Sequence, residues 1–525
     1  MGKVKVLTAR EAADLIKDGD TVTLSGFVAN GIAEALNAAA EERFLETGHP
    51  KDLTLFYVAG TGNKDGSHAD HYAHEGMIKR VIGGHFNFVP QICEMLYANK
   101  IEGYNIPQGA ISSMLRDSAG HKIGTFTPVG IGTFADPRLG GGRLNEKTTE
   151  DIVKVIEIEG EEQLFYPRVG LDVAFIRGTY ADELGNVTME KEMAPLDCTA
   201  QAMAVHNNGG TVVVQVEKVV KAGQLDPKLV KIPGIYVDAV VVCPAEDPHQ
   251  FQSINCPYDP AYSGNTQVAV EGLEPKKLDA KKIIGRRAAM ELKKNVVVNL
   301  GVGVPEWVSA VAAEEGVSDE MTLTVECGPI GGVPGGGLRF GGTLNAQAYV
   351  DEPYQFDFYD GGGLDLCYLG LAEVDPSGNV NVSRLGTRIT GSGGFMNISS
   401  NSKKAIFCGT FTNGVKIKTG DGKLTILEEG KKHKFVNKVT EITFSGVVAG
   451  KKGKDVLYVT ERAVFALKAD GVHLIEVAPG IDVETQVLAE MDFQPIVDRD
   501  ENGNVKLMDE RIFKDEVMGM TLSDK

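Results

Sequence analysis

The sequence contains one α/β unit twice, and this internal repeat constrains the fold more than any other feature. An Arg-x-Ala-Ala motif occurs in a helical segment at Arg10 and again at Arg286. Each segment is followed by a short β-branched strand, a glycine turn and a further helix, which is the order of a βα unit. The repeat predicts two domains of the same kind.

A constant separation between later motifs supports the duplication. Gly170-Leu171-Asp172 matches Gly363-Leu364-Asp365 at a separation of 193 positions (363−170), and Met203 and Met396 keep that separation. The early helical motifs are 276 positions apart (286−10), so the first copy carries an insertion. Most of the insertion should lie between Thr61 and Pro167. Spacing that persists across several motifs is typical of a repeat.

The alternation of strands and helices predicts the fold class. A short strand at Thr21–Leu24 leads through a glycine turn to a helix at Ile32–Glu42, and Leu53–Val58 is a strand that enters another glycine turn. In the second half, Lys416–Leu427 and Val456–Val477 are predicted to be strands and hairpins. Strands that alternate with helices favour parallel sheets. We therefore expect two tandem, duplicated open α/β domains with mostly parallel sheets.

The domain bounds follow from the repeat and from local composition. Residues 1–258 are predicted to form the first domain, with the insertion around 61–167, and residues 279–525 the second. Residues 259–278 between them lie in a stretch rich in Pro, Gly, Ser and Asp and show no periodic pattern. This segment is predicted to be a linker.

Composition and charge exclude several classes of function. The chain of 525 residues is long enough for two or more cores, and its formal net charge of −19 argues against nucleic acid or an anionic membrane surface as the main partner. The seven cysteines are scattered without a CxxC pair, which indicates reduced thiols. The sequence has neither an apolar leader nor a run of roughly 18 apolar residues. We expect a cytoplasmic protein without lipid.

The segment Met321–Gly337, MTLTVECGPIGGVPGGG, gives the strongest functional signal. Its first half alternates as a strand does and ends at an acid, Glu326, which a glycine-rich loop follows. Glycines leave backbone N–H groups open to a ligand. Alignment of the two copies puts Val58 opposite Glu326, so the carboxylate is present in one copy only. A residue needed only for the scaffold would be expected in both, and the asymmetry favours a functional Glu326.

Two further glycine clusters lie where backbone N–H groups can face an anion. Asn299–Pro305 follows a predicted strand and opens a helix, and Ile389–Met396 has a similar character. Each cluster alone is also compatible with a close-packed turn. Together with Glu326, the clusters suggest a carboxylate nucleophile with nearby oxyanion donors.

Two weaker signals favour structural roles. The run Gly60–Gly66 has GxGxxxG spacing, and the residues after it make a weak start for the helix that a dinucleotide fingerprint needs. His68, His71 and His74 do not share one helix face, and no further ligand set accompanies them. We expect hydrogen-bonded or solvated histidines rather than a metal site.

The chain resembles the family I coenzyme A transferases along essentially its whole length. Asp18–Gly31 is similar to the family's first signature, which ends G-G-F-x-x-x-G-x-P, although Ser25 replaces the first glycine and Ala33 the proline. Val325-Glu326-Cys327-Gly328 stands where the family has a Ser-Glu-Asn-Gly type of motif whose glutamate is the nucleophile. The departures at its first and third positions indicate the propionate branch. Gly391–Gly394 is similar to the G-x-G-G motif that helps to form the oxyanion hole.

The resemblance implies an enzyme that transfers coenzyme A (CoA) between a short-chain acyl-CoA and a free short-chain carboxylic acid of the acetate, propionate, lactate or butyrate class. Glu326 would carry the reaction through a glutamyl-CoA thioester, with ping-pong kinetics. CoA would be a substrate, and neither a cofactor nor a metal is expected. The resemblance also implies a homotetramer.

The other candidate site residues are of two kinds. Those expected to supply oxyanion donors or CoA contacts are Val302, Gly303, Gly328, Gly393 and Gly394. Gln108, in Pro107-Gln108-Gly109 of the insertion, is expected to contact the acid substrate.

Three alternative functions remain open at the level of sequence. An acyl-CoA hydrolase of the same fold would let water intercept the same intermediate. A nucleotide-dependent oxidoreductase would bind its cofactor at Gly60–Gly66. A non-catalytic ligand-binding duplicate would lose no turnover when Glu326 is replaced.

Overall fold

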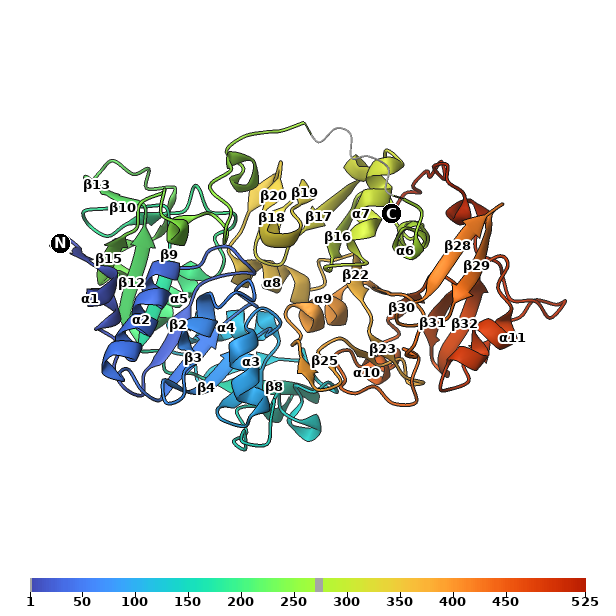
Figure 1. The fold of residues 1–525 in the computed structure, drawn as a ribbon, viewed down its shortest axis with the longest axis horizontal. Coiled ribbons are helices and arrows are strands. Elements are labelled where there is room, and N and C mark those ends of the chain that lie inside the picture. Colours follow the sequence, from blue (N-terminus) through green and yellow to red (C-terminus); the bar gives the residue numbers. More distant parts are fainter. Residues whose placement is uncertain (1, 270–276) are drawn as a thin grey trace. The chain divides into compact units, whose positions relative to one another are not determined.

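The computed structural model describes residues 2–269 and 277–525 (Figure 1). Contacts between residues divide the chain into two compact units. The first comprises Met1–Val268, Val325–Asp357 and Ile389–Asn397, and the second comprises Ala269–Thr324, Phe358–Arg388 and Ile398–Lys525. The first unit therefore includes two segments from the second half of the sequence. The domain bounds inferred from the repeat stay a prediction, and residues 270–276 of the predicted linker lie outside the described residues.

The first unit is built on a sheet of eight strands that all run parallel. In spatial order these are β1 (Lys5–Leu7), β15 (Ala239–Val242), β12 (Thr211–Val216), β9 (Val173–Arg177), β2 (Thr21–Leu24), β3 (Leu53–Tyr57), β4 (Ile78–Gly83) and β5 (Glu102–Asn105). Every residue of β3 and β9 is buried. Central strands of a parallel sheet are buried in this way because helices cover both faces.

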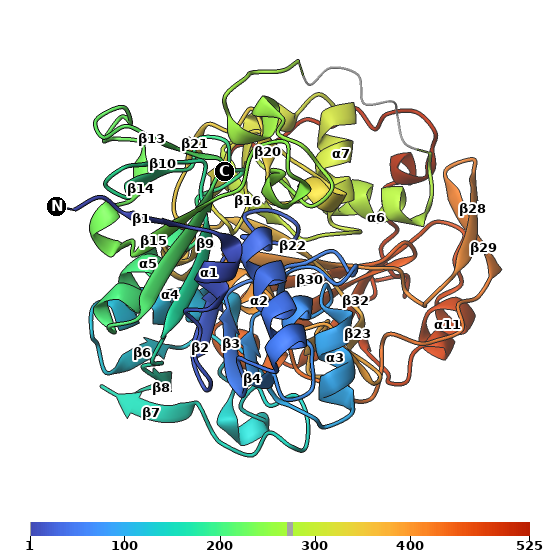
Figure 2. The same ribbon diagram turned by 60° about the vertical axis from the view of Figure 1, so that its left-hand side comes forward.

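Helices cover the two faces of this sheet. They are α1 (Ala9–Ala13), α2 (Glu34–Thr47), α3 (Pro90–Tyr97), α4 (Gln108–Ala119) and α5 (Cys198–Asn207). Val173 and Phe175 of β9 belong to the core that contains α1, α2 and α3, whereas Ala174 and Ile176 belong to the core that contains α4 and α5. This alternation is the two-residue period of a strand. Figure 2 shows α1, α2 and α3 gathered on one side of β2, β3 and β4.

Smaller sheets complete the first unit. Residues 61–167 include β4, α3, β5, α4 and an antiparallel sheet in the order β6 (Gly124–Thr127), β8 (Glu161–Pro167) and β7 (Lys154–Ile158). A four-stranded sheet has the order β13 (Lys218–Val220), β10 (Tyr180–Asp182), β11 (Val187–Thr188) and β14 (Val230–Ile232). Two antiparallel pairs follow Glu326 along the chain: β18 (Pro329–Ile330) with β21 (Ala348–Tyr349), and β19 (Val333–Pro334) with β20 (Thr343–Leu344).

The second unit contains a second, mostly parallel arrangement of strands. Their spatial order is β17 (Met321–Thr324), β16 (Val296–Leu300), β22 (Leu366–Gly370), β27 (Lys404–Cys408), β30 (Asp455–Val459), β31 (Ala463–Lys468), β32 (Gly471–Val477) and β33 (Ile496–Val497). The first five run parallel, and β30, β31 and β32 form an antiparallel meander. The predicted strands and hairpins at Lys416–Leu427 and Val456–Val477 are confirmed, the first as β28 (Lys416–Gly420) and β29 (Lys423–Glu428).

The second unit has helices of its own. They include α6 (Ala280–Ala289), α7 (Glu306–Glu314), α10 (Gly446–Lys451) and α11 (Val483–Gln486). Side chains of α6 and α7 pack with β16, β17 and β22 in one hydrophobic core. In the part of the chain that the structure describes, none of the helices is both long and apolar enough to cross a membrane.

The two units confirm the duplication strand by strand. The order β3-β2-β9-β12-β15 of the first recurs as β17-β16-β22-β27-β30 in the second. The register recurs too, because Val22 pairs with Val173 in the first unit and Val298 with Leu366 in the second. Val173 and Leu366 are separated by the same 193 positions (366−173) as the sequence motifs. The expected class of tandem α/β domains with mostly parallel sheets is therefore correct.

Candidate active site

Glu326 lies on a tight turn directly after β17. The N–H of Gly328 donates to the carbonyl of Val325 at 3.0 Å, and the N–H of Val325 donates to the carbonyl of Pro329 at 3.0 Å. The side chains of Val325 and Cys327 on either side are 3% and 0% exposed, whereas Glu326 is only partly buried. The turn therefore anchors its apolar residues in the core and presents the carboxylate at the edge of that core.

Gly328 is required by the shape of this turn. Its φ is +131°, and a Cβ at this position would lie 2.2 Å from the carbonyl oxygen of Val350. The N–H of Val350 donates to the carbonyl of Gly328 at 3.1 Å, which holds the two backbones together. The N–H of Gly328 already donates to the carbonyl of Val325. We therefore infer that a glycine is needed here because it lets the backbone of Val350 approach closely.

The loop Gly391–Gly394 packs against the ends of β4 and β5. The N–H of Ser392 donates to Oδ1 of Asn105 at 3.0 Å, and the N–H of Gly393 donates to the carbonyl of Gly84 at 2.7 Å. No hydrogen bond from the N–H of Gly394 is found among the described residues. Of Gly393 and Gly394, the two candidate residues in this loop, Gly394 is thus the one whose N–H donor is open.

Gln108 joins this loop to Glu352. Gln108 is the first residue of α4 and is 2% exposed, and its N–H donates to the carbonyl of Gly393 at 3.1 Å. Its side-chain Nε2 donates to Oε1 of Glu352 at 2.8 Å. Glu352 is the first residue of α8 (Glu352–Asp360) and is 0% exposed. Two residues that are 244 positions apart in the sequence therefore share one buried hydrogen bond.

Buried acidic groups near Glu326 favour their neutral forms. Burial raises the pKa of Glu352 well above its usual value, and the charges of Asp197 and Glu326 raise that pKa further. Burial, together with the charge of Asp351, raises the pKa of Asp197 to about 7. Burial also raises the pKa of the Cys327 thiol, to which the charge of Glu326 contributes. Glu326 is thus close enough to act on both Cys327 and Glu352, and its neutral neighbours place little competing negative charge beside it.

Val302 and Gly303 belong to the second unit, in the loop between β16 and α7. The N–H of Gly303 donates to Oε1 of Glu306, the first residue of α7, at 3.0 Å, so this donor is already used within the protein. Val302 is 64% exposed, and no hydrogen bond from its N–H is found within the described ranges. Its donor is open to a ligand.

The sequence did not single out Glu352 and Asp197. Both stand next to a helix start, at the beginning of α8 and as the N-cap residue of α5. Acids at helix starts are usually solvated and interact with the helix dipole, so the local pattern predicts surface residues. Only the packing of distant segments buries them.

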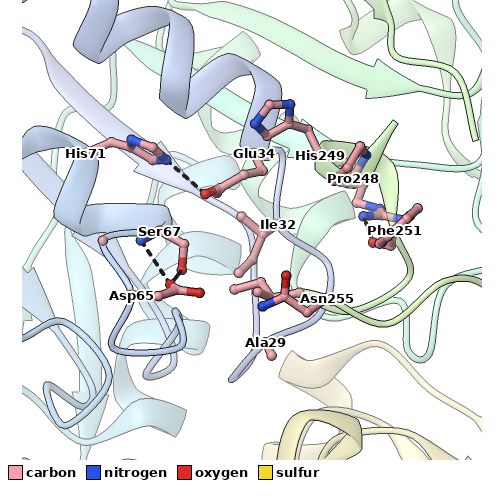
Figure 3. Close-up of a pocket in the computed structure, with 13 residues that line it drawn as sticks. Ala29, Ile32, Glu34, Asp65, Ser67, His71, Pro248, His249, Phe251 and Asn255 are labelled. Carbon is pink, nitrogen blue, oxygen red and sulfur yellow. Dashed lines mark hydrogen bonds and ion pairs between the residues drawn. The ribbon is translucent and has the colours of Figure 1, made fainter. Parts of the chain in front are cut away.

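A cavity of about 260 Å³ lies in the first unit, at the loops that follow β2 and β3 (Figure 3). Glu34 and Asp65 line it, and Figure 3 shows His71 directed toward Glu34 and Ser67 directed toward Asp65. The run Gly60–Gly66 reaches this cavity. The chain then enters a five-residue 3-10 helix rather than the crossover α-helix of a dinucleotide site. Because the helix N-terminus that binds a pyrophosphate in such sites is missing after this described loop, the cavity does not support the oxidoreductase alternative.

The three histidines after this loop are hydrogen-bonded, as the sequence predicted. His71 contacts Glu34 at 2.8 Å and Glu41 at 2.6 Å, and His74 contacts Glu41 at 2.6 Å. His68 is buried and contacts Oγ1 of Thr61 at 2.6 Å. Within residues 2–269 and 277–525, no group of three or more His, Cys, Asp or Glu side chains is arranged to hold a metal ion.

Comparison with known proteins identifies the family. The family model described as Coenzyme A transferase matches residues 6–243. Acetate CoA-transferase YdiF from Escherichia coli (strain K12) is 45% identical over 527 residues, which cover 100% of this chain and 98% of that protein. Caffeate CoA-transferase from Acetobacterium woodii is 42% identical over 522 residues, 98% of each chain. The chain belongs to the family I coenzyme A transferases and is a CoA-transferase enzyme.

Solved structures agree with this assignment. The crystal structure of the acyl-CoA transferase YdiF apoenzyme from Escherichia coli O157:H7 has a TM-score of 0.94 and 43% sequence identity, and the match covers 100% of this chain and 99% of that one. A second structure of that protein, described as a thioester complex with CoA, has a TM-score of 0.93 and the same identity of 43% over the same shares. The likeness extends over the whole chain, so it includes both copies of the α/β unit.

Proposed function

We propose that the protein transfers CoA between a short-chain acyl-CoA and a free short-chain carboxylic acid of the acetate, propionate, lactate or butyrate class, with Glu326 as the nucleophile. The observation that carries the proposal is the Glu326 carboxylate, held on a turn after β17 beside buried groups that favour their neutral forms. The names acetate CoA-transferase and caffeate CoA-transferase of the two relatives support an acid as acceptor.

The proposed reaction has two halves. The carboxylate of Glu326 attacks the thioester carbonyl of acyl-CoA, so that an acyl-glutamyl anhydride forms and the CoA thiolate leaves. The thiolate then attacks the glutamyl carbonyl, the acyl group leaves as a free carboxylate, and CoA remains on Glu326 as a thioester. The incoming acid reverses these steps, which gives ping-pong kinetics without ATP. CoA is a substrate, and the scheme needs neither a cofactor nor a metal.

Backbone donors can stabilise the tetrahedral oxyanions of these steps. Among the candidate residues, the N–H groups of Gly394 and Val302 are the open ones, so we assign them this role. The N–H groups of Gly303, Gly328 and Gly393 bond within the protein, and we infer that these glycines shape the loops instead. Loss of one oxyanion donor costs about 2.7–4 kcal/mol in a studied enzyme. Gln108 is proposed to contact the acid.

The nucleophile can be trapped as a covalent adduct. The protein incubated with acetyl-CoA and no acceptor acid should gain the mass of CoA, because the glutamyl thioester is the resting point of the half-reaction. Peptide mapping should place the adduct between Thr322 and Gly332. The description of the YdiF structure as a thioester complex with CoA supports this expectation. An adduct on another residue would contradict the mechanism.

Two substitutions at Glu326 separate shape from charge. Glu326→Gln keeps the shape but lacks the anionic oxygen, so it should fold normally and form no adduct. Glu326→Asp withdraws the carboxylate by one methylene, and a displacement of about 1 Å should lower turnover at least about 100-fold. Normal transfer by the Glu326→Gln variant would end the proposal. Release of free acid and CoA without an acceptor, at the rate of transfer, would indicate the hydrolase alternative.

We infer a homotetramer in the cytoplasm, on the basis of the family resemblance and of seven cysteines that are all unpaired. Light scattering of the purified protein tests the tetramer, and fractionation of the source cells tests the location.

A further inference from the structure

Glu352 is a buried carboxyl group that the proposed mechanism does not use. Its side chain is 0% exposed, and its N–H donates to the carbonyl of Leu196 at 2.9 Å. Its Oε1 accepts from Nε2 of Gln108, whereas its Oε2 is buried with no hydrogen-bond partner in the described part of the chain. An ionised carboxylate that is fully buried and accepts from a single donor would be strongly destabilised, and the neutral form avoids that cost.

Asp197 makes ionisation of Glu352 still less favourable. Asp197 is 1% exposed, and its Oδ2 also has no hydrogen-bond partner among the residues described. Burial and the charge of Asp197 raise the pKa of Glu352, and burial raises the pKa of Asp197 itself to about 7. Two buried carboxyl groups that repel each other share at least one proton at neutral pH.

The other charged groups near this pair come from the surrounding segments. Asp351 precedes α8 and pairs with Nζ of Lys231 at 3.0 Å. Glu326, on the turn after β17, adds its negative charge, and Cys198 at the start of α5 is a thiol whose pKa is raised by burial. Of these groups only Lys231 is a cation, and it is already paired with Asp351. The surroundings therefore favour a protonated Glu352.

The hydrogen bond to Glu352 fixes the orientation of the Gln108 amide. A Cβ built on Gly393 would lie 3.6 Å from Oε1 of Gln108, so the amide lies between Gly393 and Glu352. The amide nitrogen carries two hydrogens. One points to Glu352, and the other can donate to an oxygen of a bound molecule.

We propose that Glu352, as an uncharged carboxyl group, is a positioning residue that orients the Gln108 amide so that its second N–H meets an oxygen of the acid substrate. This inference deepens the proposed function and rests on it. Ionisation of Glu352 would place a negative charge near the incoming carboxylate and would repel it. Binding of the acid should then weaken as the pH rises.

Steady-state kinetics of Glu352→Gln and Glu352→Ala between pH 6 and 9, with acetate and acetyl-CoA, test the proposal. In the wild type, kcat/KM for acetate should fall as the pH rises across this range, because Glu352 loses its proton. Glu352→Gln supplies the same acceptor without a charge, so it should stay within about threefold of the wild type at pH 6.5 and lose that fall. Glu352→Ala should raise KM for acetate about tenfold, which corresponds to one hydrogen bond, and change KM for acetyl-CoA much less.

Gln108→Ala provides the matched control. It should raise KM for acetate as Glu352→Ala does, and the double variant should be no worse than either single variant, because one interaction is removed in all three. A Glu352→Gln variant as impaired as the Glu352→Ala variant, an unchanged pH profile, or additive losses would each overturn the inference. Thermal unfolding of each variant separates these effects from misfolding.

The CoA adduct distinguishes this inference from the proposed function. Glu352→Ala should still form the adduct on Glu326, because the positioning acts on the acid and not on the nucleophile. An adduct in the wild type combined with contradictory kinetics at Glu352 would overturn only the positioning role. Absence of the adduct from the wild type would overturn the proposed function, and the inference with it.

Discussion

At the scale of single residues, the glycines around Glu326 differ in what they contribute. Gly328 and Gly391 have φ values of +131° and +84°, and a Cβ on either would lie within 3.0 Å of backbone atoms. Gly393 has a φ of +53°, so a side chain there is strained although space is available. Substitution in this left-handed region costs roughly 1–2 kcal/mol. The sequence alone treats these glycines as equivalent, whereas their backbone angles separate them.

We expect Gly394→Ala to affect rate more than folding. The N–H of Gly394 is open, and a methyl group there would enter the space that an oxyanion needs. Turnover should fall at least about tenfold while the melting temperature stays near the wild-type value. Gly328→Ala is the matched control and should lower the melting temperature, because its Cβ would meet the carbonyl of Val350 at 2.2 Å. Equal losses of stability and activity in Gly394→Ala would indicate that Gly394 is needed for packing and not for oxyanion binding.

At the scale of secondary-structure elements, the two copies use the same motif differently. Arg286 of α6 is 1% exposed, and its guanidinium donates to the carbonyls of Ile512 at 3.2 Å and Glu516 at 2.9 Å. Arg10 of α1 forms surface ion pairs with Asp14 and Glu46. The arginine of the second copy therefore hydrogen-bonds α6 to the C-terminal segment of the chain, whereas the arginine of the first copy makes no such contact among the described residues.

Arg286→Met should destabilise the second unit strongly. It leaves several buried carbonyl groups without a donor, and the hydrogen bonds that it removes involve a charged group. We expect a loss of about 3 kcal/mol or more in the free energy of unfolding. Arg10→Met removes only surface ion pairs and should change that free energy by less than about 1 kcal/mol. Urea unfolding of both variants, followed by circular dichroism, measures the difference, and similar losses would contradict this account.

At the scale of the whole molecule, stability should depend on pH through the buried acids. The pKa of Asp197 is raised to about 7 in the folded protein, from an ordinary value near 4 in an unfolded chain. The folded state thus binds more protons between about pH 4 and 7, and stability from this group falls as the pH rises through that window.

Asp197→Asn removes this proton uptake. The variant should be more stable than the wild type at pH 8, where the wild type must bury a charge, and similar to it near pH 4, where both side chains are neutral. Melting temperatures measured across pH 4–8.5 test the sign. A variant that is less stable than the wild type at pH 8 would show that the Asp197 carboxylate is stabilised by its surroundings.

The sequence predicted correctly which local elements are present, but it did not predict where each of them ends. The helical segment predicted at Arg10 is present as α1, with Thr8 and Glu11 in a capping box, but α1 is only five residues long and ends at Ala13. The residues after Gly66 form a short 3-10 helix that buries Ala69 and Tyr72 in the core, while its His71 bonds to Glu34 and Glu41 of α2. Local patterns identify an element, and tertiary contacts decide where it ends.

Local sequence patterns were enough to predict the repeated βα order, the parallel sheets and the single carboxylate at a strand end, because periodicity and turn residues act between near neighbours in the chain. Which glycine donors are open and which acids are buried follows from the packing of distant segments. Gln108 and Glu352 meet across 244 positions, and the charges of Asp197 and Glu326 act on Glu352 through the fold. Burial and charge coupling depend on distances in space, and the local pattern does not encode those distances.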